Sequence, residues 1–336
     1  MADNSTVMTL DGTPVLVTGA AGFIGSHLVE ALLERGAHVR AFLRYDSQNR
    51  LGHLADLTPD ERARITIMRG DLKDPDAVRR AVTGCDIVFH LGALIAIPFS
   101  YQNPTDYVQT NIVGTLHVLN ACRDARVRRL IHTSTSEVYG TAQSVPITLD
   151  HPRRGQSPYA ASKIAADALV ESYHRSFGLP TVTIRPFNTY GPRQSPRAVI
   201  PTIISQALAG DTIRLGSTAP TRDFLYVTDT AAGFVAAATA PDSILGSELQ
   251  LGTGIETSIQ KVVDVTAGLL GRKLQVMTEE KRLRPEHSEV ERLLCDPSMA
   301  HTRLNWRHTV SLDEGLAHVI DWIRAHTIDA PQEYVV

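Results

Sequence analysis

A glycine-rich turn between an apolar strand and an amphipathic helix is the feature that most constrains how this chain folds. It lies in LVTGAAGFIGSHLVEALLERG, residues 16–36, where glycines at 19, 22 and 25 follow an apolar run and apolar residues then recur at helical intervals. Glycines at this spacing allow a tight turn and bring the backbone close to a pyrophosphate, whose charge meets the free N–H groups at the helix start. A glycine triplet alone would fit an ordinary turn, but strand, loop and helix in this order predict a dinucleotide site. The predicted contacts are Gly19, Gly22, Phe23, Ile24 and Gly25.

Short β-branched runs alternate with helical patterns through the first 190 residues. Such alternation, with almost continuous apolar strands, is typical of a parallel sheet covered by helices on both faces. We therefore predict an α/β, doubly wound parallel sheet whose ligands bind along the edge where the strands end. The predicted strands lie at 14–19, 38–43, 64–71, 86–93, 129–136 and 180–188.

The alternation loosens after NTYGPRQSPR, residues 188–197. Scattered Pro, Arg and Glu then predict a smaller C-terminal substrate-binding lobe over residues 191–222 and 259–330. Between these stretches, residues 223–258 have the pattern of a segment that returns to the first domain, which we assign to residues 10–190.

The composition argues against several classes of function. The formal net charge of -3 disfavours general binding to nucleic acid or to anionic membranes. Three well-separated cysteines form no CxxC pair and the 13 histidines show no metal-ligand spacing, so we predict neither a disulfide framework nor a metal site. The polar start and the lack of a long apolar run predict a soluble, cytoplasmic protein.

The end of the second predicted strand bears on which dinucleotide binds. NAD sites commonly place an acid there, whereas this chain has Leu43 followed by Arg44, with Arg50 nearby. NADP is therefore open beside NAD, unless Arg44 simply faces solvent. Asp71, which closes the third strand, is a candidate for the adenine end, or else a loop cap. Leu72, Leu91 and Ala93 complete the predicted cofactor pocket.

A tyrosine and a lysine stand four residues apart in SPYAASK, residues 157–163. On a helix Tyr159 and Lys163 share a face, one turn apart. A neighbouring ammonium and a cationic nicotinamide ring would both favour the phenolate, so Tyr159 is a candidate proton acceptor and both residues are expected at the cofactor. The spacing is weak by itself and gains weight from the glycine-rich turn.

Together these motifs resemble the extended short-chain dehydrogenase/reductases, within the nucleotide-sugar epimerase/dehydratase group. The resemblance rests on TGAAGFIGSH, HLGA, STSEVYG, SPYAASK, RPFNTYGPRQ and TRDFLYVTD, in this order along nearly the whole chain. It implies a Rossmann domain with a small substrate lobe and a homodimer joined through a helix pair. It also implies a catalytic triad of Thr135, Tyr159 and Lys163, with Thr135 on the sugar O4.

The step after oxidation at C4 depends on the residues that come next to Thr135. In the 4,6-dehydratases of this group a glutamate takes the C5 proton, and Glu137 would lie on the same side of a continuing strand. Ser136 stands where glucose-type members carry an aspartate and is a candidate, though weaker, proton donor; otherwise Glu137 handles both protons or the reaction is a different one. The closest resemblance is to N-acetylglucosamine nucleotide 4,6-dehydratases of the legionaminic-acid type, acting on a UDP- or GDP-linked sugar. A 4-epimerase, a UDP-glucuronate decarboxylase and a 5,6-dehydratase remain alternatives.

The nucleotide diphosphate of such a substrate needs cations and amide donors. The resemblance implies Asn188, Arg193 and Arg222 for this role, with Arg284 and Glu286 completing the nucleoside pocket. A dinucleotide-sensing regulator without catalysis is the alternative from another class, and the complete Thr, Tyr and Lys positions argue against it.

Overall fold

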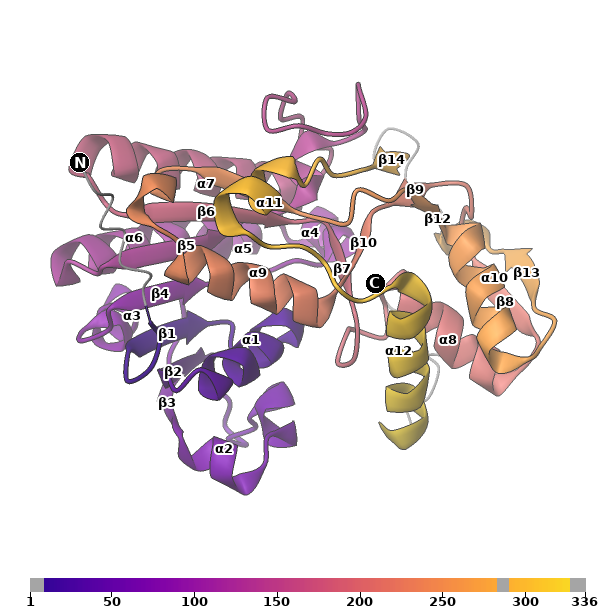
Figure 1. The fold of residues 1–336 in the computed structure, drawn as a ribbon, viewed down its shortest axis with the longest axis horizontal. Helices are drawn as coiled ribbons and strands as arrows, with labels where there is room; N and C mark the ends of the chain where they lie inside the picture. The colour runs from indigo at the N-terminus through magenta and orange to yellow at the C-terminus, as the bar shows by residue number, and fades with distance from the viewer. Residues whose placement is uncertain (1–8, 283–289, 327–336) are drawn as a thin grey trace.

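A seven-stranded parallel sheet forms the centre of the molecule (Figure 1). The computed structural model describes residues 9–282 and 290–326. The strands lie in the order β11-β6-β5-β4-β1-β2-β3. From β1 the chain first adds strands on one side, β2 and β3, and then crosses over to add β4 and later strands on the other side. Ligands of doubly wound folds bind at this switch point between β1 and β4. Their bounds are β1 Pro14–Thr18, β2 His38–Leu43, β3 Ile65–Arg69, β4 Ile87–His90, β5 Arg129–Thr133, β6 Thr181–Pro186 and β11 Glu248–Leu251.

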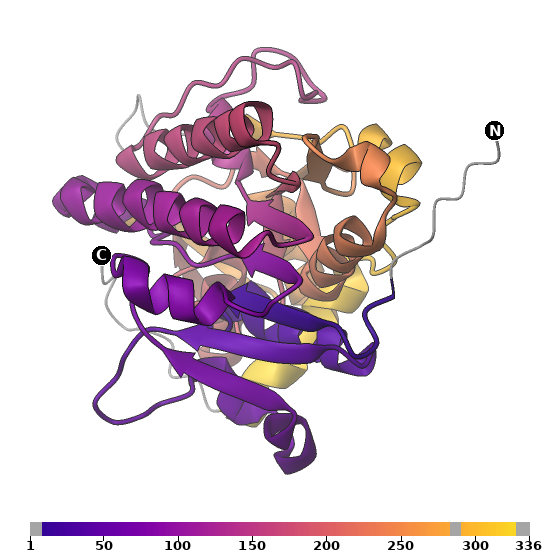
Figure 2. The ribbon, with the colours of Figure 1, turned by 90° about the vertical axis from the view of Figure 1, so that its left-hand side faces the viewer.

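Helices cover both faces of this sheet, as Figure 2 shows from the side. Along β1, Val15 and Val17 face one layer and Leu16 the other, because successive side chains of a strand alternate. The first layer holds α1 (Phe23–Glu34), α9 (Val227–Thr239) and α11 (Ser298–Leu304). The second holds α3 (Pro75–Val82), α6 (Gly114–Ala125) and α7 (Pro158–Phe177). The predicted doubly wound α/β Rossmann fold is thereby confirmed.

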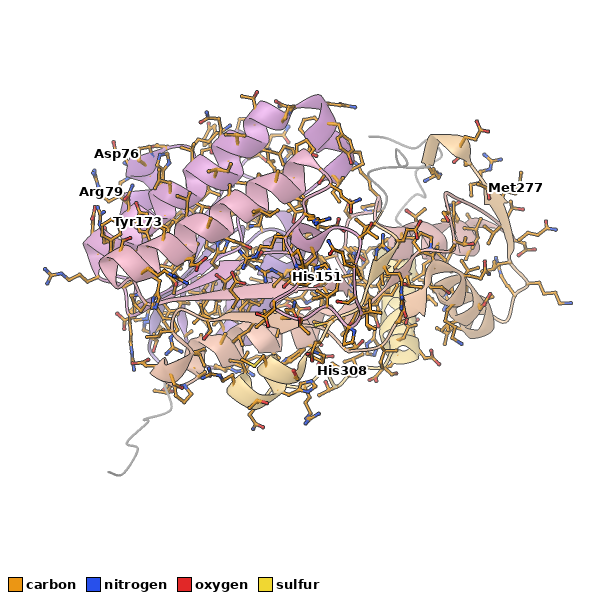
Figure 3. All side chains as sticks on the ribbon, turned by 90° about the horizontal axis from the view of Figure 1, so that it is seen from above. Asp76, Arg79, His151, Tyr173, Met277 and His308 are labelled. Atoms are coloured by element: carbon orange, nitrogen blue, oxygen red, sulfur yellow. The ribbon has the colours of Figure 1, made fainter. Side chains whose placement is uncertain are left out.

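A second apolar core lies beside the sheet, in the part of the molecule that carries the labelled Met277 in Figure 3. It is built around Ile203, Val262 and Ile320, each almost fully buried. Its helices are α8 (Val199–Ala209), α10 (Ile259–Leu270) and α12 (Leu312–His326). Its strands and those next to it are β7 (Asn188–Tyr190), β8 (Thr212–Leu215), β9 (Thr221–Arg222), β10 (Phe224–Tyr226), β12 (Thr257–Ser258), β13 (Gln275–Thr278) and β14 (Arg292–Leu293).

One segment departs from the predicted lobe boundaries. α11 falls within residues 259–330, yet Ala300 and Leu304 pack into the sheet core with α9. Trp306 joins them and donates its indole N–H to the carbonyl of Asp229 at 3.0 Å. Burial of these apolar side chains therefore returns α11 to the sheet before α12 completes the second core.

Short helical turns make up the remaining described elements: η1 (Gly52–Asp56), α2 (Pro59–Ala63), α4 (Ile97–Gln102), α5 (Pro104–Tyr107), the π-helical turn η2 (Val108–Val113), η3 (Ser136–Tyr139), η4 (Asp242–Ile244) and η5 (Glu280–Arg282). Among the described helices none combines the length and apolar character that crossing a membrane requires.

Candidate active site

The glycine-rich turn has the geometry of a dinucleotide cradle. Gly19 has a φ of +69°, and a Cβ there would meet the Gly92 nitrogen at 2.9 Å. A Cβ at Gly25 would come within 2.2 Å of the Gly19 carbonyl oxygen. α1 begins at Phe23 without a side-chain cap, so the N–H groups of its first turn, including Ile24, are free for an anion. This backbone fits a pyrophosphate, which a side chain at either glycine would displace.

The loop after β4 lies against this turn. The backbone N–H of Leu91 donates to the Thr18 carbonyl at 3.3 Å, and that of Gly92 donates to Thr18 Oγ1 at 3.0 Å. Leu72 packs on Gly92 from the neighbouring loop. The predicted cofactor segments around Leu91, Ala93 and Leu72 therefore meet the glycine-rich turn at one sheet edge.

Several arginines lie at the end of β2, where the adenosine of the cofactor is predicted to bind. The Arg50 Nε donates to Asp46 at 2.6 Å, while Arg69 donates to the Asn49 side-chain oxygen at 2.8 Å. Arg44 is exposed. Asp46, three residues beyond the position where an acid was sought, is thus already paired with a guanidinium.

Asp71 closes a turn at the same edge. One of its carboxylate oxygens accepts from the backbone N–H of Lys73 at 2.9 Å. This is the loop-capping role that the sequence left open, and the adenine contact stays a prediction.

The expected geometry of Thr135 and Glu137 is wrong in one respect. β5 ends at Thr133, and residues 136–139 form the 3-10 turn η3, so these side chains do not share a strand face. Thr135 instead caps the turn: its Oγ1 accepts from the Glu137 N–H at 3.2 Å. Ser136, at the start of the turn, is buried.

Thr135, Glu137 and Tyr159 nevertheless converge. Burial raises the pKa of Tyr159 above its usual value, a hydrogen bond to the Thr135 side chain lowers it, and the nearby Glu137 charge raises it again. The Tyr159 ring also stands edge-on to Tyr107, with centroids 6.3 Å apart. The Tyr107 hydroxyl donates to the Ala96 carbonyl at 2.5 Å, which ties the loop after β4 to this cluster. No sequence motif had singled out Tyr107.

Lys163 lies one helical turn beyond Tyr159 on α7, as the spacing predicted. Its ammonium donates to the Thr133 carbonyl at 2.6 Å, at the last residue of β5. Burial lowers the pKa of Lys163 to about 8. Lys163 thus connects α7 to the strand end that leads into the Thr135 turn.

The residues predicted to bind the nucleotide diphosphate lie in different surroundings. Asn188 starts β7 at the sheet edge, and its buried Oδ1 has no hydrogen-bond partner within the part of the chain that the structure describes. Arg222 is buried on β9 and donates to the carbonyl of Thr221 at 2.8 Å. Arg284 and Glu286 lie outside the described residues.

Arg193 lies in an intramolecular ion-pair network. Its guanidinium pairs with Glu30 at 2.7 Å and with Asp56 at 3.3 Å, and it donates to Ser26 Oγ at 3.3 Å. Arg193 and the His27 side chain lower the pKa of Glu30 to about 2, against the effect of burial. With these two carboxylates and Ser26 as partners, Arg193 fastens the loop after β7 to α1, and its contact with a diphosphate stays a prediction.

A second group of buried polar residues was missed. Asp167, Arg185 and His132 lie beneath the Thr135 turn, joined by hydrogen bonds. His132 is buried, and its Nδ1 has no partner among the described residues. One sequence feature could have pointed to this group: Asp167 follows Lys163 by four residues and therefore lies on the same face of the helix. Across the described residues no cluster of His, Cys, Asp and Glu is suited to a metal ion.

Comparison with known proteins agrees with this geometry. The family model described as GDP-mannose 4,6 dehydratase matches residues 16–319. The chain belongs to this family. Family members among characterised proteins include a UDP-glucose 4-epimerase of Mycolicibacterium smegmatis, 34% identical over 92% of this chain and 98% of that protein. A dTDP-glucose 4,6-dehydratase of Actinoplanes sp. is 31% identical over 93% of this chain and 98% of that protein.

Solved structures of the same family superimpose closely. The UDP-glucuronic acid 4-epimerase from Bacillus cereus, in complex with UDP-glucuronic acid and NAD, has a TM-score of 0.85 at 31% identity, over 94% of this chain and 100% of that one. DesIV, a dTDP-glucose 4,6-dehydratase from Streptomyces venezuelae with NAD bound, has a TM-score of 0.82 at 31% identity, over 93% and 97%. The predicted nucleotide-sugar epimerase/dehydratase family, and with it an enzyme, is confirmed. Epimerases and dehydratases are similarly close.

Proposed function

We propose that this protein is an NAD-dependent 4,6-dehydratase of a UDP- or GDP-linked N-acetylglucosamine, with a 4-keto-6-deoxy sugar nucleotide as its product. The observation that carries the proposal is the position of Glu137, whose charge acts on Tyr159 across the same small site as Thr135. A 4-epimerase needs a proton acceptor at O4 but no acid-base residue near C5 and C6. A carboxylate beside the Tyr159 hydroxyl therefore favours elimination.

Each side chain has a distinct role in this proposal. Thr135 donates a hydrogen bond to the sugar O4 and orients it, while Tyr159 accepts the O4 proton. A bound nicotinamide would supply the hydride acceptor and donor. Glu137 removes the C5 proton and passes it to the C6 hydroxyl, which leaves as water and leaves a C5–C6 double bond. The 4-keto-6-deoxy product then requires a hydride at C6 and a proton at C5, and this proton balances the one that Tyr159 takes from O4. Lys163 donates to the Thr133 carbonyl and carries its positive charge one helical turn from Tyr159 on α7.

Ser136 has no catalytic part in this scheme. It stands where glucose-type members carry an aspartate, and a serine hydroxyl is a much weaker acid than a carboxyl group. Glu137, which is partly exposed, is therefore proposed to handle both protons of the elimination.

The main rival is a 4-epimerase, because relatives with that activity are as similar as the dehydratases. The test is mass spectrometry of products from a panel of UDP- and GDP-N-acetylglucosamine, dTDP-glucose, UDP-glucose and UDP-glucuronate. Dehydration lowers the substrate mass by one water. Unchanged mass with an inverted C4 would establish the epimerase instead. Loss of carbon dioxide from UDP-glucuronate would establish a decarboxylase.

Deuterium tracing distinguishes two kinds of dehydratase. A 4,6-dehydratase returns the hydride to C6, whereas a 5,6-dehydratase returns it to C4. Tight cofactor binding without turnover of any sugar would support the sensing regulator.

NAD is proposed as the cofactor, since the solved relatives contain it. Arg44 keeps NADP open, because it is exposed next to Leu43 and no acid occupies that position. Calorimetry with NAD and NADP decides the matter: weaker NADP binding by Arg44→Ala, with NAD binding unchanged, assigns Arg44 to a 2′-phosphate. Equal effects on both would remove that role.

A homodimer is proposed through α6 and α7, which lie side by side on the surface in Figure 3. On α7 the small residues Ala161 and Ala168 are exposed and Ala165 is half-buried. Small side chains on one face let a second helix pair approach closely.

A further inference from the structure

Arg185, on β6, is fully buried and reaches several segments of the chain: besides a 3.2 Å ion pair from its Nη1 to Glu248 on β11, it has three contacts near the site. Its Nη2 donates to Asp167 Oδ2 at 2.8 Å, and its Nη1 to the Tyr139 hydroxyl at 2.8 Å. Its Nε donates to Ser134 Oγ at 3.3 Å. The planar guanidinium makes all three contacts at once, which a lysine ammonium on a flexible stem does not reproduce.

Two of these contacts bracket the turn of the active site. Ser134 immediately precedes Thr135, and Tyr139 follows Glu137 by two residues. Tyr139 is fully buried, and its ring also lies 5.1 Å from the Arg185 guanidinium carbon. The turn is therefore held from beneath at both ends by one side chain.

The third contact leads to the catalytic helix. Asp167 lies one turn beyond Lys163 on α7 and is almost completely buried. Besides Arg185 it accepts from His132 Nε2 at 3.1 Å and from Ser134 Oγ at 2.6 Å. Asp167 thus joins α7 to the same strand end that leads into the turn.

Stability alone is a weak explanation for the buried Arg185–Asp167 ion pair. A buried ion pair is often no more stabilising than apolar side chains of similar volume, because both charges lose their hydration. What the Arg185–Asp167 pair supplies here is a fixed geometry between two segments, since the planar guanidinium and the carboxylate bond groups on both at set angles.

We infer that Arg185 is a positioning residue, which through Ser134, Tyr139 and Asp167 sets the turn bearing Thr135 and Glu137 against the helix bearing Tyr159 and Lys163. This inference rests on the proposed function only for its effect on the elimination step. Its structural part is independent of the substrate.

The test compares Arg185→Lys with Arg129→Lys. Arg129 is equally buried, on the adjacent strand β5, but it donates to the carbonyls of Ala237, Ala238 and Ala240 at the end of α9 and pairs with Asp242. Both variants keep a positive charge and lose buried hydrogen bonds. Only Arg185→Lys should disturb the active-site turn.

The first readout is amide hydrogen exchange, followed by mass spectrometry, in the peptide covering residues 134–140 of the full-length protein. Exchange there should be faster in Arg185→Lys and unchanged in Arg129→Lys. Equal exchange in this peptide for both variants and the unaltered protein would overturn the inference. Because no substrate takes part, this readout holds even if the proposed function fails.

The second readout is the reaction with the panel sugar that turns over fastest. For Arg185→Lys we expect kcat to fall by about 10²-fold with KM nearly unchanged, since a small misplacement of a catalytic group costs this much. Reduced nicotinamide should accumulate during turnover, as in Glu137→Gln, because elimination slows more than C4 oxidation. A lowered unfolding midpoint with normal kcat, as expected for Arg129→Lys, would reduce Arg185 to a purely structural role.

Tyr139→Phe is the second variant, needed if Arg185→Lys does not fold. It removes only the hydroxyl that Arg185 and the Gln250 amide contact, and keeps the ring. Faster exchange in residues 134–140 supports the inference, and unaltered exchange contradicts it.

Discussion

Tyr159 and Lys163 are both buried, and burial shifts the pKa of each toward its uncharged form: upward for the phenol and, for the ammonium, down to about 8. The Thr135 hydrogen bond opposes this shift at Tyr159. Asp167 opposes it at Lys163, where its negative charge raises the pKa. In the proposed mechanism Tyr159 needs a positive charge nearby to accept a proton, and Lys163, one helical turn away on α7, would supply it while protonated.

Lys163→Met tests this burial effect through stability. The pKa of Lys163 falls from its ordinary value of 10.5 to about 8 in the folded chain, so between these values the unfolded chain binds more protons. The free energy of unfolding of the unaltered protein, relative to Lys163→Met, should rise with pH across this window, by at most about 3 kcal/mol at about 1.36 kcal/mol per pH unit. Below it the difference should be flat. Denaturant titrations at intervals across and below this window measure it; a difference that falls with pH would contradict the assignment.

Glu137→Gln tests the elimination. Loss of an acid-base group should lower dehydration about 10²–10⁴-fold while C4 oxidation continues, so reduced nicotinamide should build up. Rapid-mixing absorbance follows the cofactor and mass spectrometry the product. The control is Glu171→Gln, an exposed acid on the outer part of α7. Normal dehydration by Glu137→Gln would exclude the proposed role.

The candidate site lies at the edge of the sheet, where strands end and helices begin. The residue at which each of these elements ends or begins therefore decides which groups face the site. The strand predicted to run to residue 136 ends at Thr133, because the Thr135 cap folds the next residues into η3. The start of α1 is equally specific: its amides are free because Gly22 has no side chain to cap them. The pattern of apolar residues predicts the end of a strand or helix poorly when a single hydrogen bond sets that end.

Gly25→Ala tests the cradle at the start of α1. The added Cβ would overlap the Gly19 carbonyl, so the loop must shift and NAD affinity should fall at least about tenfold, the equivalent of about 1.4 kcal/mol. Gly268→Ala is the matched control, since a Cβ on this exposed residue of α10 meets nothing within 4 Å. It should leave NAD binding intact and raise the free energy of unfolding by about 0.8 kcal/mol. Calorimetry and denaturant titration measure both; unchanged NAD affinity in Gly25→Ala would refute the cradle.

Across the whole molecule, the sheet and the second core are joined by contacts remote in sequence. Arg193 ties the loop after β7 to α1 and η1, and Trp306 ties the segment after α11 to α9. Asp229 accepts from the N–H groups of Thr309 and Val310, at 3.0 and 3.1 Å, and so fixes the approach to α12. These contacts hold the second core beside the edge where the candidate site lies.

Ala168→Arg tests the proposed dimer. A guanidinium in the middle of the exposed face of α7 would be buried without a partner in a helix-pair interface, and the protein should become monomeric. Ser176→Arg, near the exposed end of the same helix, should keep the dimer. Sedimentation equilibrium distinguishes the two states. A dimer that persists in Ala168→Arg would place the interface elsewhere.

The sequence by itself determined what depends on neighbours along the chain. The strand, turn and helix around Gly19 to Gly25, the parallel sheet and the Tyr159–Lys163 spacing follow from short-range periodicity and from the steric freedom of glycine. Tertiary structure alone decided what each long polar side chain meets. Arg193 finds Glu30 and Arg185 finds Asp167 because folding brings distant segments together and a buried charge must be paired. No local pattern records such a partner, and so neither the ion pairs of Arg193 nor the buried Arg185 beneath the site could be predicted from the sequence.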